Sequence, residues 1–422
     1  MGKIKITKIK SGLPVVLAPQ PGSQAVTILM MVRTGSKYES RQESGLSHFL
    51  EHMFFKGTEK YADTASLSAA LDSVGADFNA FTSKEYTGYY IKVAKKNVDV
   101  ALDVLSEMLI RSKFDEQEIE QEKGVIIEEL NMYEDNPMMK IEDVFESCLY
   151  GDTPAGWDTI GTKQTISSFK REDFIRYMQR QYGQDSSLLI VAGDVKAVPL
   201  AKVERHFADY GRSRWKNKVK TKEKQASPRV KLSYKKMDQV VMSLGVPAFA
   251  AGHKYEAAAK VLSVILGGSM SSRLFIKIRE RQGLAYSVHT SYEAYTDTGY
   301  LTTTCGIKLG KEKVAIRSIL DEYKDIAING VSAKELKKAK DLIRGKVALR
   351  LETSDEMAFW YGRQWILRDG LKSPEQAARE VAKVKAVDIQ AIAKLIFQSA
   401  KLNFAAIGPF KDEKAFLREM KV

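Results

Sequence analysis

The sequence predicts an α+β fold made of two homologous α/β-sandwich domains, each a mainly antiparallel sheet with helices packed on it. Its length of 422 residues exceeds what a single hydrophobic core usually serves. The two halves, 1–210 and 230–422, end alike, each with an apolar strand, a glycine turn and an amphipathic helix, which suggests duplication of one unit. The strand-like runs 76–82 and 88–93 are separated by only a few residues and therefore predict an antiparallel hairpin.

The elements follow in chain order from this pattern. The first ten residues alternate apolar and basic side chains, which predicts a strand and lacks the continuous apolar stretch of a signal peptide. Further strands are predicted at Val15–Leu17 and Val26–Arg33, and long helices at 95–111 and 116–134. The matching strand–helix endings are Ser187–Asp194 with Leu200–Phe207, and Leu402–Pro409 with Lys414–Met420.

A basic run separates the halves. The net charge is +13, and residues 211–236 hold eleven Lys or Arg against one Glu, so most of the excess lies in this short stretch. It contains Pro228 and has neither a helical nor a strand period, which is more typical of a solvated linker than of a nucleic-acid-binding patch. The predicted division is a domain over 1–210, a basic linker over 211–229 and a second domain over 230–422.

Composition excludes several other classes of protein. Hydrophobic residues make up 44% and charged residues 28%, which is near the globular average. The two cysteines, Cys148 and Cys305, lie far apart and indicate neither a disulfide framework nor a thiolate zinc site. No apolar run is long enough to cross a membrane. We therefore expect a soluble, cytoplasmic protein that binds neither membrane nor nucleic acid.

The stretch Gly45–Gly57, GLSHFLEHMFFKG, carries the strongest functional signal. Ser44 as N-cap and Gly57 as stop bracket a helix of about a dozen residues. At about 100° per residue, one side gathers the apolar residues Leu46, Phe49, Leu50, Met53 and Phe54, and the other gathers His48, Glu51, His52 and Phe55. Only five histidines occur in the chain, so two of them four residues apart in one helix are unusual. The alternative is that both are ordinary surface or hydrogen-bonded histidines. However, two imidazoles one turn apart can bind one zinc ion, and an adjacent carboxylate can deprotonate a zinc-bound water. H-x-x-E-H is a peptidase motif.

A catalytic zinc site needs a third protein ligand and one open position. The predicted helix 116–134 is rich in acidic residues, with Asp115 and Glu118 forming a capping-box-like start. Glu122 and Glu129 lie two turns apart on one face, whereas Glu128 points about 100° away. Taken alone, this pattern is more typical of a solvated acidic helix face.

With these residues in place, the sequence resembles the pitrilysin/insulinase zinc metallopeptidases, the inverzincins that include the two-domain bacterial enzymes and the mitochondrial processing peptidase beta subunit. Their signature is H-x-x-E-H followed, after about seventy residues, by two glutamates seven positions apart, as in His48–His52, Glu122 and Glu129. The resemblance implies that His48, His52 and Glu129 bind one zinc per chain. It implies that Glu51 is the general base and that Glu122 supports the site electrostatically.

The resemblance covers most of the chain. Val32–Glu39 looks like the family's lead-in strand and turn, and 75–87 like the strand at the sheet edge with which a peptide substrate pairs. It implies substrate-binding roles for Asn79, Ala80, Phe81 and Thr82, although these residues could form a plain edge strand. In the second half, which lacks H-x-x-E-H, it implies that Arg279 and Tyr286 reach the substrate, Arg279 as a cation and Tyr286 as a donor to the oxyanion.

The resulting hypothesis is a zinc-dependent endopeptidase that hydrolyses peptides or short unfolded polypeptides. The family's long members join four such domains into a chamber, so a two-domain chain implies a dimer, either a homodimer or a heterodimer with a related chain. Arg279 and Tyr286 would then act in trans. The alternative is a non-catalytic scaffold or partner subunit, because some relatives keep the fold in such a role. Those relatives usually lose part of the metal set or of the Arg/Tyr pair, and neither set is broken in this sequence.

Overall fold

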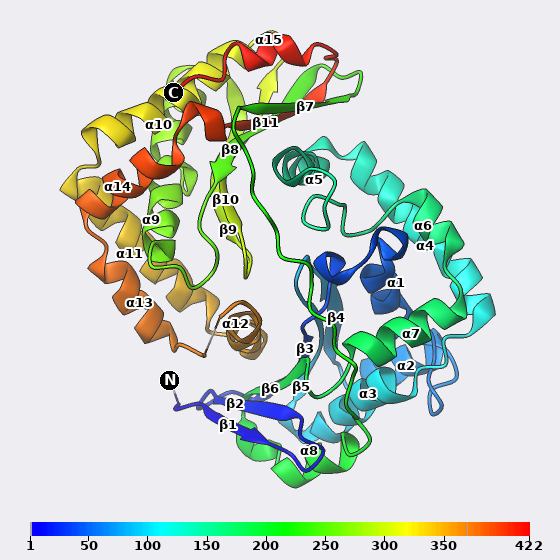
Figure 1. Ribbon diagram of the computed structural model, residues 1–422. Coiled ribbons are helices and arrows are strands. Elements are labelled where there is room, and N and C mark those ends of the chain that lie inside the picture. The colour runs from blue at the N-terminus through cyan, green and yellow to red at the C-terminus, as the bar shows by residue number, and fades with distance from the viewer. Residues whose placement is uncertain (1, 369) are drawn as a thin grey trace. The chain divides into compact units, whose positions relative to one another are not determined.

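The chain forms two compact units, each built around its own sheet (Figure 1). The computed structural model describes residues 2–368 and 370–422. Unit 1 comprises residues 1–131, 158–219 and 348–371, and unit 2 comprises 132–157, 220–347 and 372–422. Each unit therefore collects segments from both halves of the sequence.

The sheet of unit 1 has the order β1-β2-β6-β3-β5-β4. Only β2 and β6 pair in parallel, and the other neighbours are antiparallel. The central strand β3 is almost wholly buried, whereas β4 lies at the edge with one side unpaired. The strands are β1 (Lys5–Lys8), β2 (Pro14–Pro19), β3 (Ala25–Val32), β4 (Asp77–Thr82), β5 (Thr87–Ala94) and β6 (Ser187–Gly193).

Helices pack on this sheet, and most of them lie in the connections between its strands. They are α1 (Leu46–Met53), α2 (Thr64–Asp72), α3 (Val98–Arg111), α4 (Glu116–Asp135), α6 (Lys163–Ser168), α7 (Arg171–Gln181), α8 (Leu200–His206) and α12 (Ser354–Leu367). The last residues of α4 are grouped with unit 2. Helix α1 packs against β4 and α7, and this contact brings the histidine motif to the edge of the sheet.

Unit 2 repeats this topology without a first strand. Its sheet has the order β7-β11-β8-β10-β9, again with one parallel pair, β7 with β11. The strands are β7 (Arg229–Tyr234), β8 (Gln239–Pro247), β9 (Ala285–Ala294), β10 (Gly299–Lys308) and β11 (Asn403–Gly408). The helices are α5 (Pro137–Tyr150), α9 (Glu256–Gly267), α10 (Glu312–Asn329), α11 (Ala333–Arg350), α13 (Pro374–Lys383), α14 (Ala386–Ile396) and α15 (Glu413–Leu417), with a π-helix, η5, at Phe275–Arg281.

The predicted fold class is confirmed, and so is the hairpin, whose strands β4 and β5 pair antiparallel from Asp77 opposite Lys92 to Thr82 opposite Thr87. The matching endings appear as β6 with α8 and β11 with α15. In the described part of the chain, no helix is both long and apolar enough to cross a membrane.

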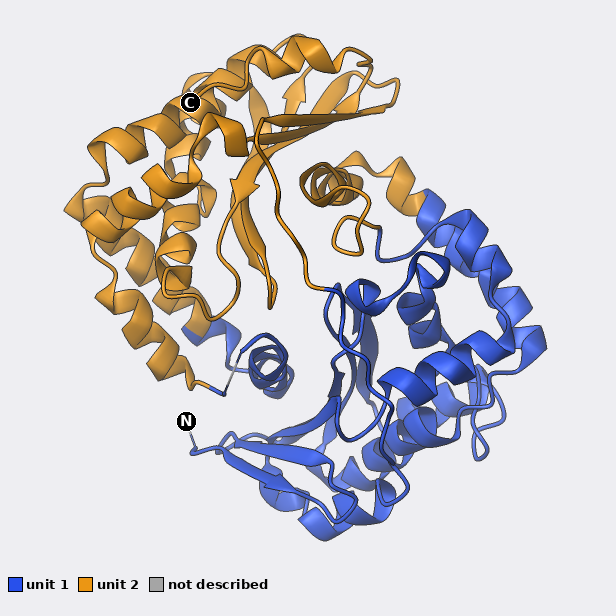
Figure 2. Ribbon diagram, in the orientation of Figure 1, with its two compact units in different colours: residues 1–131, 158–219, 348–371 blue, residues 132–157, 220–347, 372–422 orange. Residues whose placement is uncertain are grey.

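The units differ from the predicted domains in two exchanged helices (Figure 2). Helix α5, from the first half of the sequence, packs on β7, β8 and β11 of unit 2. Helix α12, from the second half, packs on β3 and β6 of unit 1, where Thr27 and Ser354 share a hydrogen bond of 2.8 Å and Lys92 binds Asp355 at 2.8 Å. An amphipathic pattern shows that a helix has a buried face, but not which sheet buries it.

The basic segment is also more ordered than a solvated linker. Residues 211–219 belong to unit 1, where the indole of Trp215 donates to the carbonyl of Arg33 at 3.0 Å. The ammonium of Lys218 lies 3.3 Å from the buried carboxylate of Glu85, which Lys37 also binds at 2.7 Å. A buried carboxylate needs such cationic partners, so part of the basic run is structural. Arg229, where the predicted linker ends, begins β7.

Helix α12 approaches β3 so closely that Gly362 has no room for a side chain. A Cβ there would lie 2.6 Å from Cγ of Met31. We expect Gly362→Val to lower the free energy of unfolding by about 2–3 kcal/mol through overpacking. Gly345 in α11 is the control, because a Cβ there meets nothing within 4 Å, and Gly345→Ala should raise stability by about 0.4–1 kcal/mol. Denaturant unfolding measures both, and an unchanged Gly362→Val protein would contradict this packing.

Candidate metal centre

Helix α1 presents the two histidines because its apolar stripe fixes its rotation. Leu46, Phe49, Leu50 and Met53 are fully buried, as predicted, and the ring of Phe49 packs edge-on against Phe174 of α7 at 4.9 Å. The opposite face therefore carries the imidazoles. The centroids of the His48 and His52 rings lie 4.7 Å apart.

Helix α4 supplies the acidic side chains. Asp115 immediately precedes its first residue, and the Asp115 carboxylate accepts from the backbone N–H groups of Gln117 and Glu118. Its buried face holds Glu122 together with three aliphatic residues, Ile119, Ile126 and Leu130. Two turns after Glu122, Oε2 of Glu129 lies 3.7 Å from Nε2 of His48 and 3.5 Å from Nε2 of His52.

These donor atoms fit a zinc ion. One atom from each of His48, His52 and Glu129 lies within 4.8 Å of the others, and this is the cluster of potential metal ligands found in the described residues. In a tetrahedral site with ligands about 2.0–2.1 Å from the metal, neighbouring donors stand roughly 3.4 Å apart. The two N···O distances are close to that spacing. Two imidazoles and one carboxylate are also the donor set of several catalytic zinc enzymes, which keep the fourth position open.

Glu122 contributes no atom to the cluster of candidate ligands but contacts one of the two imidazoles. Its Oε1 lies 2.8 Å from Nδ1 of His52, and its other oxygen forms an ion pair with Lys56. A carboxylate at Nδ1 fixes the ring orientation so that Nε2 faces the metal position. Lys56 was not predicted from the sequence, although its position four residues after His52 could have indicated it. The resemblance implies a supporting role for Glu122, and this contact with His52 is the one that such a role would use.

The two imidazoles differ in their electrostatic surroundings. Burial lowers the pKa of His48 to about 4, with the neighbouring His52 adding to the effect. Burial also opposes the charge on His52, but its hydrogen bonds to Glu122 and Glu129 outweigh burial and raise its pKa to about 9. The hydrogen bond with His52 in turn holds the pKa of Glu129 below its usual value. Metal ligands must be deprotonated, so a metal bound here would displace the proton that these hydrogen bonds favour on His52.

Glu51 lies beside the cluster on the same helix. The hydroxyl of Thr82, at the end of β4, donates to its Oε2 at 2.5 Å. Burial raises the pKa of Glu51 to about 7, although this hydrogen bond partly offsets the effect. A carboxyl group with a pKa near neutrality is suited to accept a proton and to return it.

The strand β4 presents its side chains to two faces. Thr82 and Phe78 face α1, where the ring of Phe78 lies 6.3 Å from that of Phe55. Phe81 points to the other face, against Phe359 of α12 at 5.4 Å. Asn79 is exposed, and its Oδ1 accepts from the backbone N–H of Ala80 at 2.8 Å. The structure thus places the four predicted substrate-binding residues on an edge strand beside the histidine motif.

Arg279 and Tyr286 lie together in unit 2. Arg279 is carried by the π-helix η5, and its guanidinium stands 4.7 Å from the ring of Phe275 and 5.1 Å from that of Tyr286. Tyr286, at the start of β9, is 84% exposed. Both side chains are therefore near the surface of their unit.

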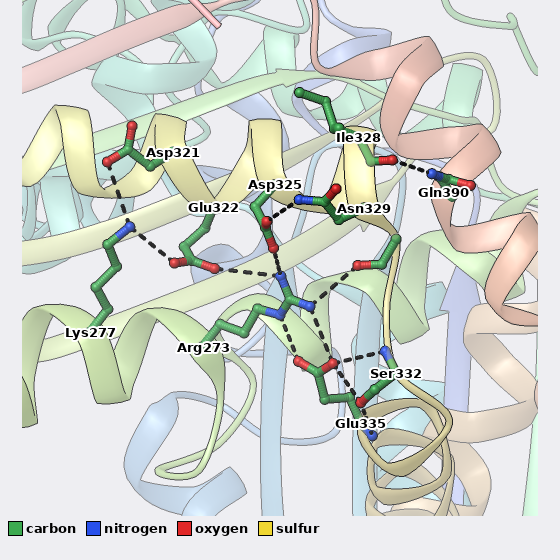
Figure 3. A network of polar contacts seen from close by, with 11 residues as sticks. Arg273, Lys277, Asp321, Glu322, Asp325, Ile328, Asn329, Ser332, Glu335 and Gln390 are labelled. Atoms are coloured by element: carbon green, nitrogen blue, oxygen red, sulfur yellow. Dashed lines mark hydrogen bonds and ion pairs between the residues drawn. The ribbon is translucent and has the colours of Figure 1, made fainter.

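The segment before Arg279 is anchored by a polar network around Arg273 (Figure 3). The Arg273 guanidinium donates to Asp325 at 2.6 Å and to both carboxylate oxygens of Glu335, at 2.6 and 3.2 Å. One turn on, Lys277 binds Glu322 at 3.0 Å. These contacts connect η5 and the residues before it to α10 and α11, so they hold in place the start of the π-helix that carries Arg279.

Comparison with known proteins identifies the relatives of this chain. The model of the Insulinase family (peptidase family M16) matches residues 14–163, and the model described as peptidase M16 inactive domain matches residues 168–343. The chain belongs to peptidase family M16. The first match contains all of the candidate metal ligands, and the second contains Arg279 and Tyr286.

Curated relatives extend over nearly the whole chain. An uncharacterized zinc protease of Bacillus subtilis, YmxG, is 35% identical over 93% of this chain and 96% of its own length. An uncharacterized zinc protease of Streptomyces coelicolor is 29% identical over 98% of this chain and 92% of its own length. The M16 chain is therefore similar to proteins that are named zinc proteases.

Solved structures share the fold at lower identity. A protease from Helicobacter pylori superposes with a TM-score of 0.90 at 22% identity, covering 96% of this chain and 99% of that one. A chain of complex III2 from Candida albicans superposes with a TM-score of 0.82 at 15% identity, covering 99% and 100%. At such identities these likenesses establish the two-domain fold alone.

The start of α1 differs from the prediction and depends on a residue that the sequence did not reveal. The N-cap is Gly45 in a left-handed conformation, not Ser44. In place of a cap side chain, the buried carboxylate of Glu39 accepts from the backbone N–H of Gly45 at 2.8 Å and of Ser47 at 2.6 Å. Burial raises the pKa of Glu39 to about 7. A partner six and eight residues away from the amides that it caps has no recognised local signature, because capping-box spacing is three residues.

We expect Glu39→Gln to loosen the start of α1, because each oxygen accepts one N–H and the amide nitrogen cannot. The free energy of unfolding should fall by about 1–3 kcal/mol, with weaker zinc retention against a chelator. The control is Glu43→Gln, which alters a carboxylate that accepts from the backbone N–H of Ser40 and from Arg180 but caps no part of α1, so it should leave zinc retention unchanged. Equal effects of the two changes in chelator titration would contradict a specific role for Glu39.

Proposed function

We propose that this M16 chain is a zinc-dependent endopeptidase that hydrolyses peptides or short unfolded polypeptides. The observation that carries the proposal is the convergence of His48, His52 and Glu129 on one point beside Glu51. The names of the curated relatives support zinc as the metal.

His48, His52 and Glu129 would hold the zinc, with Glu122 keeping the His52 ring in place. Bound zinc supplies Lewis acidity, which acidifies a water molecule and polarises the scissile carbonyl. Glu51 accepts the proton from the attacking water and later delivers it to the leaving amine. A carboxyl pKa raised toward neutrality by burial serves both steps.

The peptide would bind along β4 by strand addition. The unpaired side of an edge strand offers main-chain N–H and C=O groups, which grip an extended chain regardless of its sequence. The N–H of Ala80 is taken by the side chain of Asn79. A substrate carbonyl would replace Asn79 there, so binding costs little hydrogen bonding. Arg279 would bind a substrate carbonyl or carboxylate, and the Tyr286 phenol would donate to the oxyanion that develops on the scissile carbonyl.

The first test separates the base from the ligands. Purified protein should contain about one zinc per chain by elemental analysis and cleave a quenched peptide until a chelator is added. Glu51→Gln should retain zinc, because both imidazoles and Glu129 remain, while turnover falls at least about 100-fold. His52→Ala should lose the metal as well as the activity.

Two outcomes would point elsewhere. Near-normal turnover of Glu51→Gln would mean that another group is the base. A protein that binds no zinc and hydrolyses no peptide would favour the scaffold or partner-subunit alternative.

We propose further that two chains, identical or related, assemble to enclose the substrate. The chain covers nearly the full length of its curated relatives and contains two units, half the number that the family's long members join. In such a dimer, Arg279 and Tyr286 of one subunit would serve the zinc of the other. A closed isologous dimer would hold two such composite sites.

Mixing two inactive variants tests the shared site. Glu51→Gln and Tyr286→Phe chains should each be nearly inactive alone. After subunit exchange, the mixed dimer combines both lesions in one site and leaves the other intact, so activity should approach half of the wild-type value per dimer. Mixed dimers that are demonstrated by mass spectrometry and remain inactive would refute action in trans.

A further inference from the structure

The residue that joins the edge strand to the base is Thr82. It is the last residue of β4 and lies on the face of that strand that meets α1. Its hydroxyl donates to Oε2 of Glu51 at 2.5 Å. Among the described residues, the Glu51 side chain has no other hydrogen-bond partner. The orientation of the carboxylate therefore depends on the position of one hydroxyl.

That hydroxyl is held on a rigid part of the chain. Thr82 pairs with Thr87 of β5, and the backbone N–H of Ser83 closes the hairpin on the carbonyl of Tyr86 at 2.8 Å. The backbone N–H groups of Ser36 and Lys37 donate to the carbonyls of Ser83 and Lys84, at 3.3 and 2.9 Å respectively. The backbone around Thr82 is thus hydrogen-bonded on both sides just where the free edge of β4 ends.

Thr82 could instead serve only to complete the edge strand. Its side chain has a second contact, 3.4 Å from the hydroxyl of Thr87, which is at the limit of a hydrogen bond. The bond to Glu51 is much shorter and involves a charged acceptor when Glu51 is ionised, which is the stronger kind of hydrogen bond. The geometry therefore assigns the hydroxyl mainly to the carboxylate.

We propose that Thr82 is a positioning residue that orients the Glu51 carboxylate, so that the strand that binds the peptide also sets the direction of the base. The inference rests on the proposed function, because it needs Glu51 to be the base. Glu51 lies on α1, whereas the peptide would lie along β4. Among the described contacts of the Glu51 carboxylate, this hydrogen bond is the one that fixes its position relative to β4. A small misplacement of a reacting group can cost about a hundredfold in rate.

The test uses full-length, zinc-loaded protein and four substitutions. Thr82→Val keeps the shape and strand preference of threonine but removes the hydroxyl, Thr82→Ala removes it with less bulk, and Thr82→Ser retains it. Thr27→Val is the matched control, because Thr27 is a buried threonine of the same sheet whose hydroxyl bonds Ser354. Each protein is measured for zinc content, thermal unfolding, kcat and KM.

Thr82→Val and Thr82→Ala should lower kcat about 10- to 100-fold, the value of a hydrogen bond to a charged group, with KM within about twofold and zinc content unchanged. Thr82→Ser should stay within about threefold of wild type, and Thr27→Val should retain wild-type kcat. A loss that appears in KM alone, wild-type kcat in both hydroxyl-free variants, or a Thr82→Ser protein as impaired as Thr82→Val would overturn the proposal.

Peptide binding gives a readout that does not depend on turnover. In the Glu51→Gln background, adding Thr82→Val should leave the peptide Kd and the residual rate unchanged, because the carboxylate that Thr82 orients is gone. A weaker Kd would assign Thr82 to peptide binding and overturn the proposal. Failure of the proposed function is seen separately, as an inactive wild-type protein or as a Glu51→Gln protein with normal turnover.

Discussion

The hydrogen bond between His52 and Glu122 is the constraint around which the site is organised. It joins two helices whose contacting residues are 70 positions apart in sequence, and it places Glu129, two turns further along α4, opposite both imidazoles. Two carboxylates on one helix face would repel each other, and burying a charge without a partner is expensive. Lys56 and His52 neutralise the buried Glu122. Glu129 is consequently left with its oxygen directed at the ring nitrogens that a metal would bind.

The packing of the two helices makes this geometry reproducible. The apolar stripe of α1 fixes which way its histidines face, and Glu39 fixes where the helix begins. Nδ1 of His48 is buried and has no hydrogen-bond partner among the described residues. The orientation of His48 therefore depends on packing, whereas that of His52 depends on a carboxylate. The two ligands are held by different forces, and a change in the core of α1 should disturb His48 more than His52.

Local sequence patterns predicted what depends on local physics. The strands, the hairpin, the apolar stripe of α1 and the spacing of Glu122 and Glu129 all follow from periodicity. The family pattern singled out His48, His52 and Glu129, whose side chains lie together in the structure. The pattern did not predict the exchange of α5 and α12, because an amphipathic helix does not encode which sheet it covers. It also missed Glu39 and Lys56, and it misplaced the N-cap at Ser44. These depend on tertiary contacts across a turn or between helices, where sequence spacing carries little information.

The second unit shows that the fold alone does not make the site. Its strands follow the same order and pairing as β2 to β6 of unit 1, and α9, between β8 and β9, occupies the place that α1 has between β3 and β4. Yet α9 reads EAAAKVLSVILG and offers no imidazole. Solved structures with 15–22% identity share the topology without showing what this chain does, since one fold hosts many functions. The assignment of a metal centre therefore rests on the positions and the balanced charges of five side chains. They are His48 and His52 of α1, Lys56 of the turn that follows, and Glu122 and Glu129 of α4.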